Sequence, residues 1–412
     1  MNFLYNIFIH FLIFGMKVFS LFNDKTKKSV EGRKHSLKRV QEKFLSSDKV
    51  IWMHAASLGE YEQGLPVLEK LKENFPNHKI LITFFSPSGY ENVVKKKHMA
   101  DVVCYLPFDR KKSVSEFLSQ FDCEIFFTVK YDYWYHLLAE LKNRNIKTFV
   151  VSALFYESQS FFTTYGKWFA KQLKKNITWF FHQTEQSYVL AKSIGLLNSS
   201  VSGDTRFDRV RQLKIRNNHL DFVEDFISGN KTVVFGSSWQ AEEKIAQMVY
   251  VKNNDVKLII APHDLKRVEN LRGIFPEAIL YSNLKNSSIL KSSNSQTLII
   301  DSIGLLSKLY SYADVAVVGG GFHDAGLHNI LEAATFGVPV IFGNQYKKNP
   351  EADGLILANG GRSFGDEKSA AEFVSELLNK GKELKEMSEN AERFVNEKPN
   401  STELIINKML SL

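Results

Sequence analysis

Cysteine is scarce in this chain: only Cys104 and Cys123 occur among 412 residues. So small a number excludes a disulfide-stabilised scaffold and fits a reducing compartment. Neither cysteine has a metal-ligand partner at close spacing, so both are interpreted as buried apolar residues. The sequence also lacks low-complexity tracts, short-period repeats, zinc-finger spacings, RNA-binding aromatic motifs and helix-turn-helix signatures. The net charge of +8 is therefore not taken as evidence for a nucleic-acid partner.

The chain is too long for a single hydrophobic core and suits two domains of roughly 150–200 residues each. Hydrophobic residues make up 44% of it, as in ordinary globular proteins, whereas 33 phenylalanines give a high aromatic content.

Residues 1–22 are strongly apolar and are followed at once by a basic cluster. They lack the basic start and the small-residue cleavage site of a secretory signal peptide. The stretch nearly reaches the length of about 20 residues that a spanning helix needs. A thin polar stripe and the basic flank favour a helix attached to the cytoplasmic face of the cell inner membrane, spanning or lying in the interface. The alternative is a helix that packs on the protein's own core. The stripe consists of Asn2, Asn6, His10 and Lys17.

From residue 49 onward, short apolar runs alternate with amphipathic helical stretches, which is typical of a parallel sheet covered by helices. The pattern loosens at Gly203–Asp208, passes through a polar stretch to about Lys231 and then begins again. The sequence therefore predicts an α/β protein with two Rossmann-like domains. We expect a membrane-anchor helix over 1–24, an N-terminal domain over 25–208, a C-terminal domain over 209–385, and a last helical segment over 386–412 that packs back on the N-terminal domain. Strands are predicted at 50–56, 79–85, 101–107, 124–129, 148–154, 179–183, 232–238, 256–262, 278–282, 297–301, 314–320 and 339–343.

Ligands of doubly wound sheets bind beyond the carboxyl ends of the strands, so the turns after the strands are the candidate sites. The most specific turn lies within residues 314–343, where a strand runs into Gly319–Gly321 and a helix is expected to open near His328 and Asn329. Such a turn suits a phosphate, and Glu332 would reach a sugar hydroxyl. The structural alternative is a glycine-rich turn with Glu332 as a favourable first-turn acid.

Two further turns belong to the same half of the chain. Gly236, Ser237 and Ser238 follow a strand, where they would contact a phosphate or a sugar, or provide a serine N-cap partnered by Glu242 or Glu243. Pro262-His263 ends the next strand and is a candidate nucleotide contact.

The segment Ile51–Glu60, IWMHAASLGE, ends the first predicted strand and opens a helix predicted over 58–74. Ser57 and Glu60 fit the Ser-x-x-Glu capping box. Glu60 is equally placed for chemistry, because the turn lies at a strand's carboxyl end and Gly59 leaves it bare of side chain.

Four segments together resemble the 3-deoxy-D-manno-octulosonic acid (Kdo) transferases of lipopolysaccharide synthesis: HAASLGEYEQGLPVL, TFFSPSGYE, GDTRFDRV and GLHNILEAATFGVPVIFG. The resemblance covers nearly the whole chain in order, including an N-terminal membrane anchor. It implies a metal-independent, inverting GT-B glycosyltransferase without a cofactor, whose two Rossmann-like domains enclose a cleft. The donor would be CMP-Kdo, and the acceptor would be the lipid A precursor (lipid IVA) at the inner membrane.

The resemblance also implies roles for individual residues. Glu60 would be the catalytic base, since inverting transfer needs a carboxylate to take the proton of the attacking hydroxyl. Glu332 would bind the CMP ribose. A cation is needed for the donor's own carboxylate. The remaining predicted contacts are Ser57, Gly59, Ser86, Ser88, Lys130 and Arg206 on the substrate side, and Ser237, Pro262, His263, Gly320, Gly321 and Asn329 on the nucleotide side.

The chain departs from the family pattern at three places. A paired-acid motif after the fourth strand begins with Lys130 in place of an acid. The usual Pro-Arg-His reads Pro262-His263-Asp264, so an arginine–phosphate contact is missing, and Arg206 stands where a lysine is usual. Two alternatives remain: a GT-B enzyme with another nucleotide sugar, such as a UDP-sugar, and a non-catalytic, membrane-associated nucleotide-sugar binder.

Overall fold

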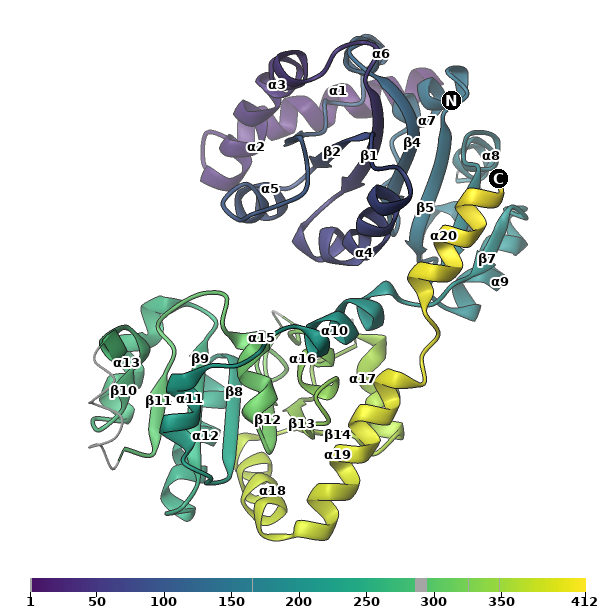
Figure 1. Ribbon diagram of the computed structural model, residues 1–412. Coiled ribbons are helices and arrows are strands. Elements are labelled where there is room, and N and C mark those ends of the chain that lie inside the picture. The colour runs from purple at the N-terminus through teal and green to yellow at the C-terminus, as the bar shows by residue number, and fades with distance from the viewer. Residues whose placement is uncertain (1, 165, 286–294, 325, 348) are drawn as a thin grey trace. The chain divides into compact units, whose positions relative to one another are not determined.

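The computed structural model describes residues 2–164, 166–285, 295–324, 326–347 and 349–412. The chain forms two compact units (Figure 1). The first unit comprises Met1–Arg209 and Pro399–Leu412, and the second comprises Val210–Lys398. Each unit is built on a seven-stranded sheet in which every strand pair is parallel.

The sheet of the first unit has the order β3-β2-β1-β4-β5-β6-β7. Its strands alternate between two buried faces, as the period of two requires. Trp52 packs into the core on one face, with residues of α3, α6 and α7, and Met53 packs into the core on the other face, with residues of α4 and α20. The strands are β1 (Lys49–Ala55), β2 (Lys79–Phe84), β3 (Val102–Tyr105), β4 (Asp122–Val129), β5 (Lys147–Ala153), β6 (Trp179–His182) and β7 (Ser199–Val201).

Helices cover both faces of this sheet (Figure 1). They are α1 (Asn2–Phe19), α2 (Asp24–Lys34), α3 (Ser36–Lys43), α4 (Leu58–Asn74), α5 (Pro87–Val93), α6 (Lys111–Leu118), α7 (Tyr135–Asn143), α8 (Lys167–Asn176), α9 (Glu185–Ser193) and α20 (Ser401–Ser411), with the 3-10 turn η1 (Ser160–Phe162).

The sheet of the second unit has the order β10-β11-β9-β8-β12-β13-β14, which differs from the first in that its fourth strand, β11, lies between β10 and β9. One of its faces packs Phe235, Ile260 and Val317 against α12, α18 and α19. Its strands are β8 (Thr232–Ser238), β9 (Lys257–Pro262), β10 (Ile279–Leu280), β11 (Thr297–Ile299), β12 (Val315–Val318), β13 (Val340–Gly343) and β14 (Gly361–Phe364).

The helices that follow Thr205 begin with α10 (Thr205–Ile215), within which the chain leaves the first unit and enters the second. The others are α11 (Asp221–Ile227), α12 (Gln240–Lys252), α13 (Val268–Ile274), α15 (Leu306–Leu309), α16 (Leu331–Ala334), α17 (Pro350–Leu357), α18 (Glu367–Asn379) and α19 (Gly381–Asn396), with 3-10 turns η2 (Leu265–Arg267), η3 (Tyr281–Lys285) and η4 (Tyr310–Tyr312).

The predicted α/β class and the two parallel sheets are confirmed, and each of the twelve predicted strands has its counterpart. Two strands were missed, β7 and β14, which lie at sheet edges and are short and partly polar. The polar stretch expected after residue 208 is largely helical, as α10 and α11.

The C-terminal segment is not one helix. Helix α19 lies wholly in the second unit, and α20 returns to the first unit, where Ile405, Ile406 and Met409 join the core beside α4.

The N-terminal helix α1 is long and apolar enough to cross a membrane, and only 11% of its residues are buried. Ile9 and Ile13 pack on the first unit. On the same side Tyr5 donates to Asp109 (2.6 Å), and the Asn6 amide oxygen lies 2.6 Å from His136 Nε2. The large apolar side chains that α1 exposes are Phe3, Leu4, Phe8, Phe11, Phe14, Val18 and Phe19, whereas Asn2, His10 and Lys17 are exposed polar residues.

Candidate active site

The turn between β1 and α4 holds Glu60 in the first turn of the helix. Ser57 is the N-cap residue, but its hydroxyl does not accept a backbone N–H as a capping box requires. Instead Ser57 Oγ donates to the Glu60 carboxylate. Gly59 is exposed, and a Cβ atom there would meet nothing closer than Ser57 Oγ at 3.9 Å. The predicted capping box is therefore wrong in its bonding, and the carboxylate is left half-buried beside an open turn.

The next turn, between β2 and α5, lies directly beside the first one. The Ser86 N–H donates to Ala56 O at 2.8 Å, which joins the two turns. Ser86 caps α5 by accepting the Ser88 N–H at 3.2 Å, and the two hydroxyls lie 3.0 Å apart. This arrangement brings the predicted contacts Ser57, Ser86 and Ser88 to one edge of the sheet.

The turn after β4 adds a second carboxylate and a strained lysine. Lys130 has a φ of +63°, which is uncommon for a residue with a side chain and typical of functional turns. Asp132 Oδ2 lies 2.6 Å from Nε2 of the fully buried His54 on β1. Burial raises the pKa of Tyr131, and the charges of Glu60 and Asp132 raise it further, so both carboxylates lie near this phenol.

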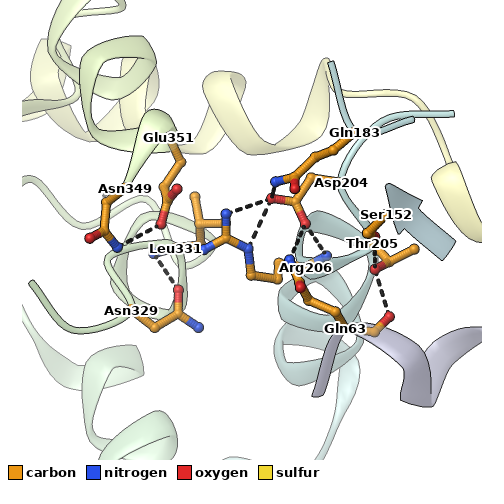
Figure 2. A network of polar contacts seen from close by, with 10 residues as sticks. All are labelled: Gln63, Ser152, Gln183, Asp204, Thr205, Arg206, Asn329, Leu331, Asn349 and Glu351. Carbon is orange, nitrogen blue, oxygen red and sulfur yellow. Dashed lines mark hydrogen bonds and ion pairs between the residues drawn. The ribbon is translucent and has the colours of Figure 1, made fainter. Parts of the chain in front are cut away.

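A polar network fixes the start of α10 in the first unit (Figure 2). Asp204, which is 7% exposed, accepts hydrogen bonds from the Arg206 backbone (3.0 Å), Nε (2.9 Å) and Nη2 (2.7 Å). The side chains of Gln63 and Gln183 also donate to it, at 3.3 Å and 2.5 Å. Burial raises the pKa of Asp204, but Arg206 outweighs burial and holds this pKa below its usual value. Arg206 is thus already paired, and Lys130 adds a second positive charge near Asp204.

The rest of the GDTRFD segment has a structural purpose. Asp208 accepts the Thr402 N–H and hydroxyl, each at 2.7 Å, and so holds the start of α20. Gly203 has a φ of +92°, and a Cβ atom there would lie 2.6 Å from Ser401 Oγ.

In the second unit, the turn after β8 is organised by Glu242 and not by a serine cap. The N-cap of α12 is Trp239, whose N–H donates to Glu242 Oε2 at 2.8 Å. Glu242 Oε1 accepts the Gly320 N–H at 3.1 Å, so one fully buried carboxylate joins this turn to the glycine turn after β12. Burial raises the pKa of Glu242. Ser237 has a φ of +51°, and Ser238 Oγ has no partner among the described residues.

The glycine run after β12 is required by close backbone packing. A Cβ atom on Gly319 would lie 2.0 Å from Ser237 O, and one on Gly321 would lie 2.7 Å from Gly343 N. Gly320 has a φ of +90°, and its N–H is already bound to Glu242. These glycines therefore shape the turn, whatever ligand contacts they make.

The helix expected after the glycine run begins at Leu331 and is a single turn, α16, so a helix dipole there contributes little. Asn329 Oδ1 accepts the Leu331 N–H at 3.1 Å (Figure 2), and Asn329 Nδ2 donates to Glu332 Oε1 at 3.2 Å. Asn329 thus orients Glu332 in the first turn.

An aromatic cluster lies over the same strand ends. Trp239 stacks on His263 with ring centroids 4.4 Å apart, and His328 lies 4.7 Å from His263. His323 meets Trp239 edge-on at 4.5 Å. Burial, followed by the neighbouring histidines, lowers the pKa of His328 to about 4, and burial lowers the pKa of His263. At neutral pH the rings of His263 and His328, on the predicted nucleotide side, are therefore uncharged.

Among the described residues, no group of three or more His, Cys, Asp or Glu side chains is arranged to hold a metal ion. Pro262 ends β9 and is half-buried, whereas His263 is exposed. Behind them, Arg267 binds the buried Glu243 with both Nε (2.6 Å) and Nη2 (2.5 Å).

Comparison with known proteins finds relatives of this chain. Residues 31–209 match the family model described as 3-deoxy-D-manno-octulosonic-acid transferase (kdotransferase). These residues make up less than half of the chain, and beyond them the chain is similar to Kdo transferases over more than 80% of its length. It is 26% identical over 342 residues to the 3-deoxy-D-manno-octulosonic acid transferase of Aquifex aeolicus, covering 81% of this chain and 88% of that one. The transferase of Chlamydia trachomatis serovar D is 25% identical, with 88% of this chain and 86% of the relative covered.

A Fusobacterium nucleatum protein named bifunctional glycosyltransferase/methyltransferase is 29% identical over 329 residues. That match covers 76% of this chain but spans only half the length of the relative. Together the relatives indicate a glycosyltransferase enzyme that uses Kdo.

Solved structures confirm the GT-B type of fold. The UDP-GlcNAc 2-epimerase of Neisseria meningitidis superposes with a TM-score of 0.61 at 17% identity, covering 88% of this chain and all of the other. A glycosyltransferase of Rickettsia africae gives 0.54 at 12% identity, with 88% and 97% covered. At these identities the likeness concerns the fold alone.

Sequence reasoning missed several residues that build the candidate site. Within HAASLGE, His54 was not singled out, although a histidine inside an apolar strand that ends at a candidate turn is a usable signal. Asp204 belongs to the segment GDTRFDRV but was not predicted as a site residue, and Glu242 was predicted only as a partner of a serine cap. Gln63 and Gln183 carried no signal, because their role depends on contacts far apart in the sequence.

Proposed function

We propose that this protein is an inverting glycosyltransferase that moves Kdo from CMP-Kdo to the lipid A precursor, lipid IVA. The observation that carries the proposal is the Glu60 carboxylate, which lies at the carboxyl end of β1 beside a bare glycine turn. Within the part of the chain that the structure describes, this carboxylate accepts a hydrogen bond from Ser57, a neighbour on the same turn. An acid placed in this way suits proton abstraction better than structural capping.

In the proposed reaction, the acceptor hydroxyl gives its proton to Glu60 as its oxygen bonds to the anomeric carbon of Kdo. The bond from that carbon to the phosphate oxygen of CMP breaks at the same time, and CMP leaves with the electron pair. Asp132 is proposed to position the acceptor, because its bond to the buried His54 fixes its orientation. Ser57, Ser86 and Ser88 are proposed as hydroxyl contacts to the acceptor sugar.

Lys130 is proposed to serve the carboxylate of Kdo. Arg206 contributes to the same positive region, although Asp204 neutralises part of its charge. Lysine at position 130 replaces an acid of the family pattern, so the chain adds a cation where its relatives carry an anion.

The donor nucleotide is proposed to bind at the strand ends of the second unit. Ser238 Oγ and Trp239 Nε1 are buried polar atoms without a protein partner among the described residues, which suits an acceptor-rich ligand such as a phosphate. The uncharged rings of Trp239, His263 and His328 suit stacking with a base. Glu332, held by Asn329, is proposed to accept the ribose hydroxyls. Ser237, Pro262, Gly320 and Gly321 are proposed to complete this wall.

Helix α1 is proposed to attach the protein to the cytoplasmic face of the inner membrane by lying in the interface. Its contacts with the first unit run from Tyr5 to Ile13, and a spanning orientation would carry Asp109 and His136 into the bilayer with it. The opposite side exposes a row of phenylalanines, which suits the boundary between headgroups and acyl chains.

The test is mass spectrometry of the products formed from CMP-Kdo and lipid IVA by the wild-type protein and by Glu60→Ala. We expect a Kdo adduct of lipid IVA from the wild type and almost none from the variant. Glu62→Ala is the matched control, because Glu62 lies two residues on and faces Arg209 at 3.5 Å. A wild type without a Kdo product would overturn the function, and a Glu60→Ala variant with near-normal turnover would overturn the assignment of the base.

A further inference from the structure

A cavity of about 310 Å³ lies within the first unit, between α1, α2, α3 and α6. This volume is near the lower end of the roughly 300–1,000 Å³ typical of ligand pockets. The cavity shares no lining residue with the candidate active site described above.

The cavity has an apolar floor and a basic rim. Ile13, Val30 and Phe117 are buried at its base, while Lys17, Lys34 and Arg110 are exposed around it. Glu116 is the one acidic side chain in the lining. Among the residues that the structure describes, Lys17, Lys34 and Arg110 form no ion pair with a carboxylate, so their charges are available to an anion. The half-buried Leu37, Pro107 and Phe108 complete the apolar walls.

One buried donor in the lining lacks a partner. Arg33 is 7% exposed; its Nη1 and Nη2 donate to the carbonyls of Ser29 (3.0 Å) and Phe85 (2.8 Å), whereas its Nε has no partner in the described part of the chain. Burial lowers the pKa of Arg33 to about 10, so the guanidinium stays charged at neutral pH. A buried, charged donor without a partner is costly unless a ligand or water satisfies it.

The start of α6 adds a second feature that attracts anions. Arg110 precedes the helix, Lys111 opens it, and its first turn contains no acid. Ser113, in that turn, lines the cavity. The free N–H groups of a helix start favour a phosphate.

We propose that this cavity binds one anionic glycerophospholipid of the bilayer, with its phosphate on the basic rim and the upper part of an acyl chain on the apolar floor. The occupant is a bilayer lipid because two lining residues, Ile13 and Lys17, belong to α1, whose neighbouring Phe14 and Val18 are exposed on the side proposed to face the membrane. Charge complementarity selects an anionic headgroup over a zwitterionic one. The bound lipid would join α1 to α2, α3 and α6 and so fix the orientation of the first unit on the membrane.

The experiment is native mass spectrometry of the full chain in non-ionic detergent, titrated with phosphatidylglycerol or phosphatidylcholine. We expect one phosphatidylglycerol to be retained and phosphatidylcholine to bind several-fold more weakly. The double variant Lys34→Ser, Arg110→Ser should lower phosphatidylglycerol retention roughly tenfold, since each basic residue contributes to headgroup attraction.

Two further variants separate the cavity from general attraction to anions. The double variant Lys25→Ser, Lys27→Ser also removes two positive charges, here both from α2, but neither residue lines the cavity. Retention of phosphatidylglycerol should therefore stay within about twofold of the wild type, because the cavity's own charges are unchanged. Ser113→Leu keeps the charge and fills the space, and it should abolish retention while the melting temperature shows that the chain is folded.

Equal retention of the two lipids would overturn the proposal, as would an equal loss in the Lys25, Lys27 variant. Displacement of phosphatidylglycerol by lipid IVA, together with a raised KM for that acceptor in the Lys34, Arg110 variant, would assign the cavity to the acceptor and also overturn it. These measurements read lipid binding, so their failure leaves the proposed transfer reaction intact.

Discussion

Glu60 and Glu242 occupy the same position in the two units. Each is the third residue of the helix that follows a central strand, β1 in one sheet and β8 in the other. Glu242 is fully buried and binds two backbone N–H groups, those of Trp239 and Gly320. Glu60 is half-buried and bonded by the Ser57 hydroxyl. The same local pattern thus gives a fully buried acid that joins two turns in one unit and a half-buried acid beside a bare glycine turn in the other.

The turns that surround Glu60 and Glu242 also differ, in the charge of their side chains. The turns of the first unit gather charge, with Asp132 and Asp204 near Lys130 and Arg206. The turns of the second unit gather glycines and uncharged rings. A charged edge suits proton transfer, and a neutral, stacked edge suits a nucleotide.

The largest expected effect comes from removing the charge of Glu60. Glu60→Gln should lower kcat by roughly 10²–10⁴-fold, the usual contribution of a general base, and leave CMP affinity unchanged. Steady-state kinetics with isothermal titration of CMP checks both halves. A variant that loses CMP affinity instead would mean that Glu60, like Glu242, is a structural acid.

The next effect is on the first unit's stability, through Asp204. Asp204→Ala removes a buried carboxylate that accepts hydrogen bonds from Arg206, whose side chain is 22% exposed, and from Gln63 and Gln183, and it should lower the free energy of unfolding by about 3 kcal/mol. Because the pKa of Asp204 is held below its usual value, this stabilisation is present above pH 4 or so and is lost as the pH falls through the lowered pKa. Urea unfolding at pH 7 and pH 3 measures it.

Asp221→Ala is the control for Asp204, because Asp221 is 92% exposed and pairs with an exposed histidine. It should change stability at either pH by less than about 0.5 kcal/mol. An equal effect of the two substitutions would show that the Asp204 network does not stabilise the unit.

Much of the fold followed from the sequence because the apolar runs are long and regular. Trp52 and Met53 alternate between two cores, as a buried parallel strand requires. The edge strands β7 and β14 were not predicted, because their residues, such as Ser199, Ser200 and Arg362, lack that alternation.

The candidate site was predicted less completely, for a physical reason. Glu60 and Ser57 are neighbours in sequence, so their pairing was foreseeable, although its geometry was not. The bonds of Glu242 to Gly320 and of Gln63 to Asp204 join residues 78 and 141 positions apart, and no local pattern encodes them.

Glu242→Ala should weaken CMP binding, which Glu60→Gln should leave unchanged. It leaves two N–H groups without the Glu242 acceptor, at a cost of about 2–3 kcal/mol, and it removes the side-chain link between the turns after β8 and β12. We expect faster hydrogen exchange in peptides covering 233–245 and 315–322, with weaker CMP binding. Glu242→Gln, which keeps one acceptor oxygen, should lie between the variant and the wild type. Unchanged hydrogen exchange in Glu242→Ala would show that Glu242 does not hold the two turns together and would contradict its role as a structural acid.

The smallest effect concerns the neutral rings of the second unit. His328 has a pKa lowered to about 4, so the unfolded chain takes up a proton at higher pH than the folded one does. The free energy of unfolding should therefore fall between about pH 6.5 and pH 4, by an amount on the order of 1–3 kcal/mol, and His328→Gln should remove that fall.

The exposed His219 provides a contrast of opposite sign, because its hydrogen bond to Asp221 raises its pKa. Its stabilisation is present at low pH and is lost as the pH rises through the raised pKa. Denaturation curves of His328→Gln and His219→Gln across this pH range should therefore diverge from the wild type in opposite directions. If both diverged in the same direction, the rings at the β12 turn would not be held neutral by burial, and a positively charged nucleotide wall would replace the neutral one.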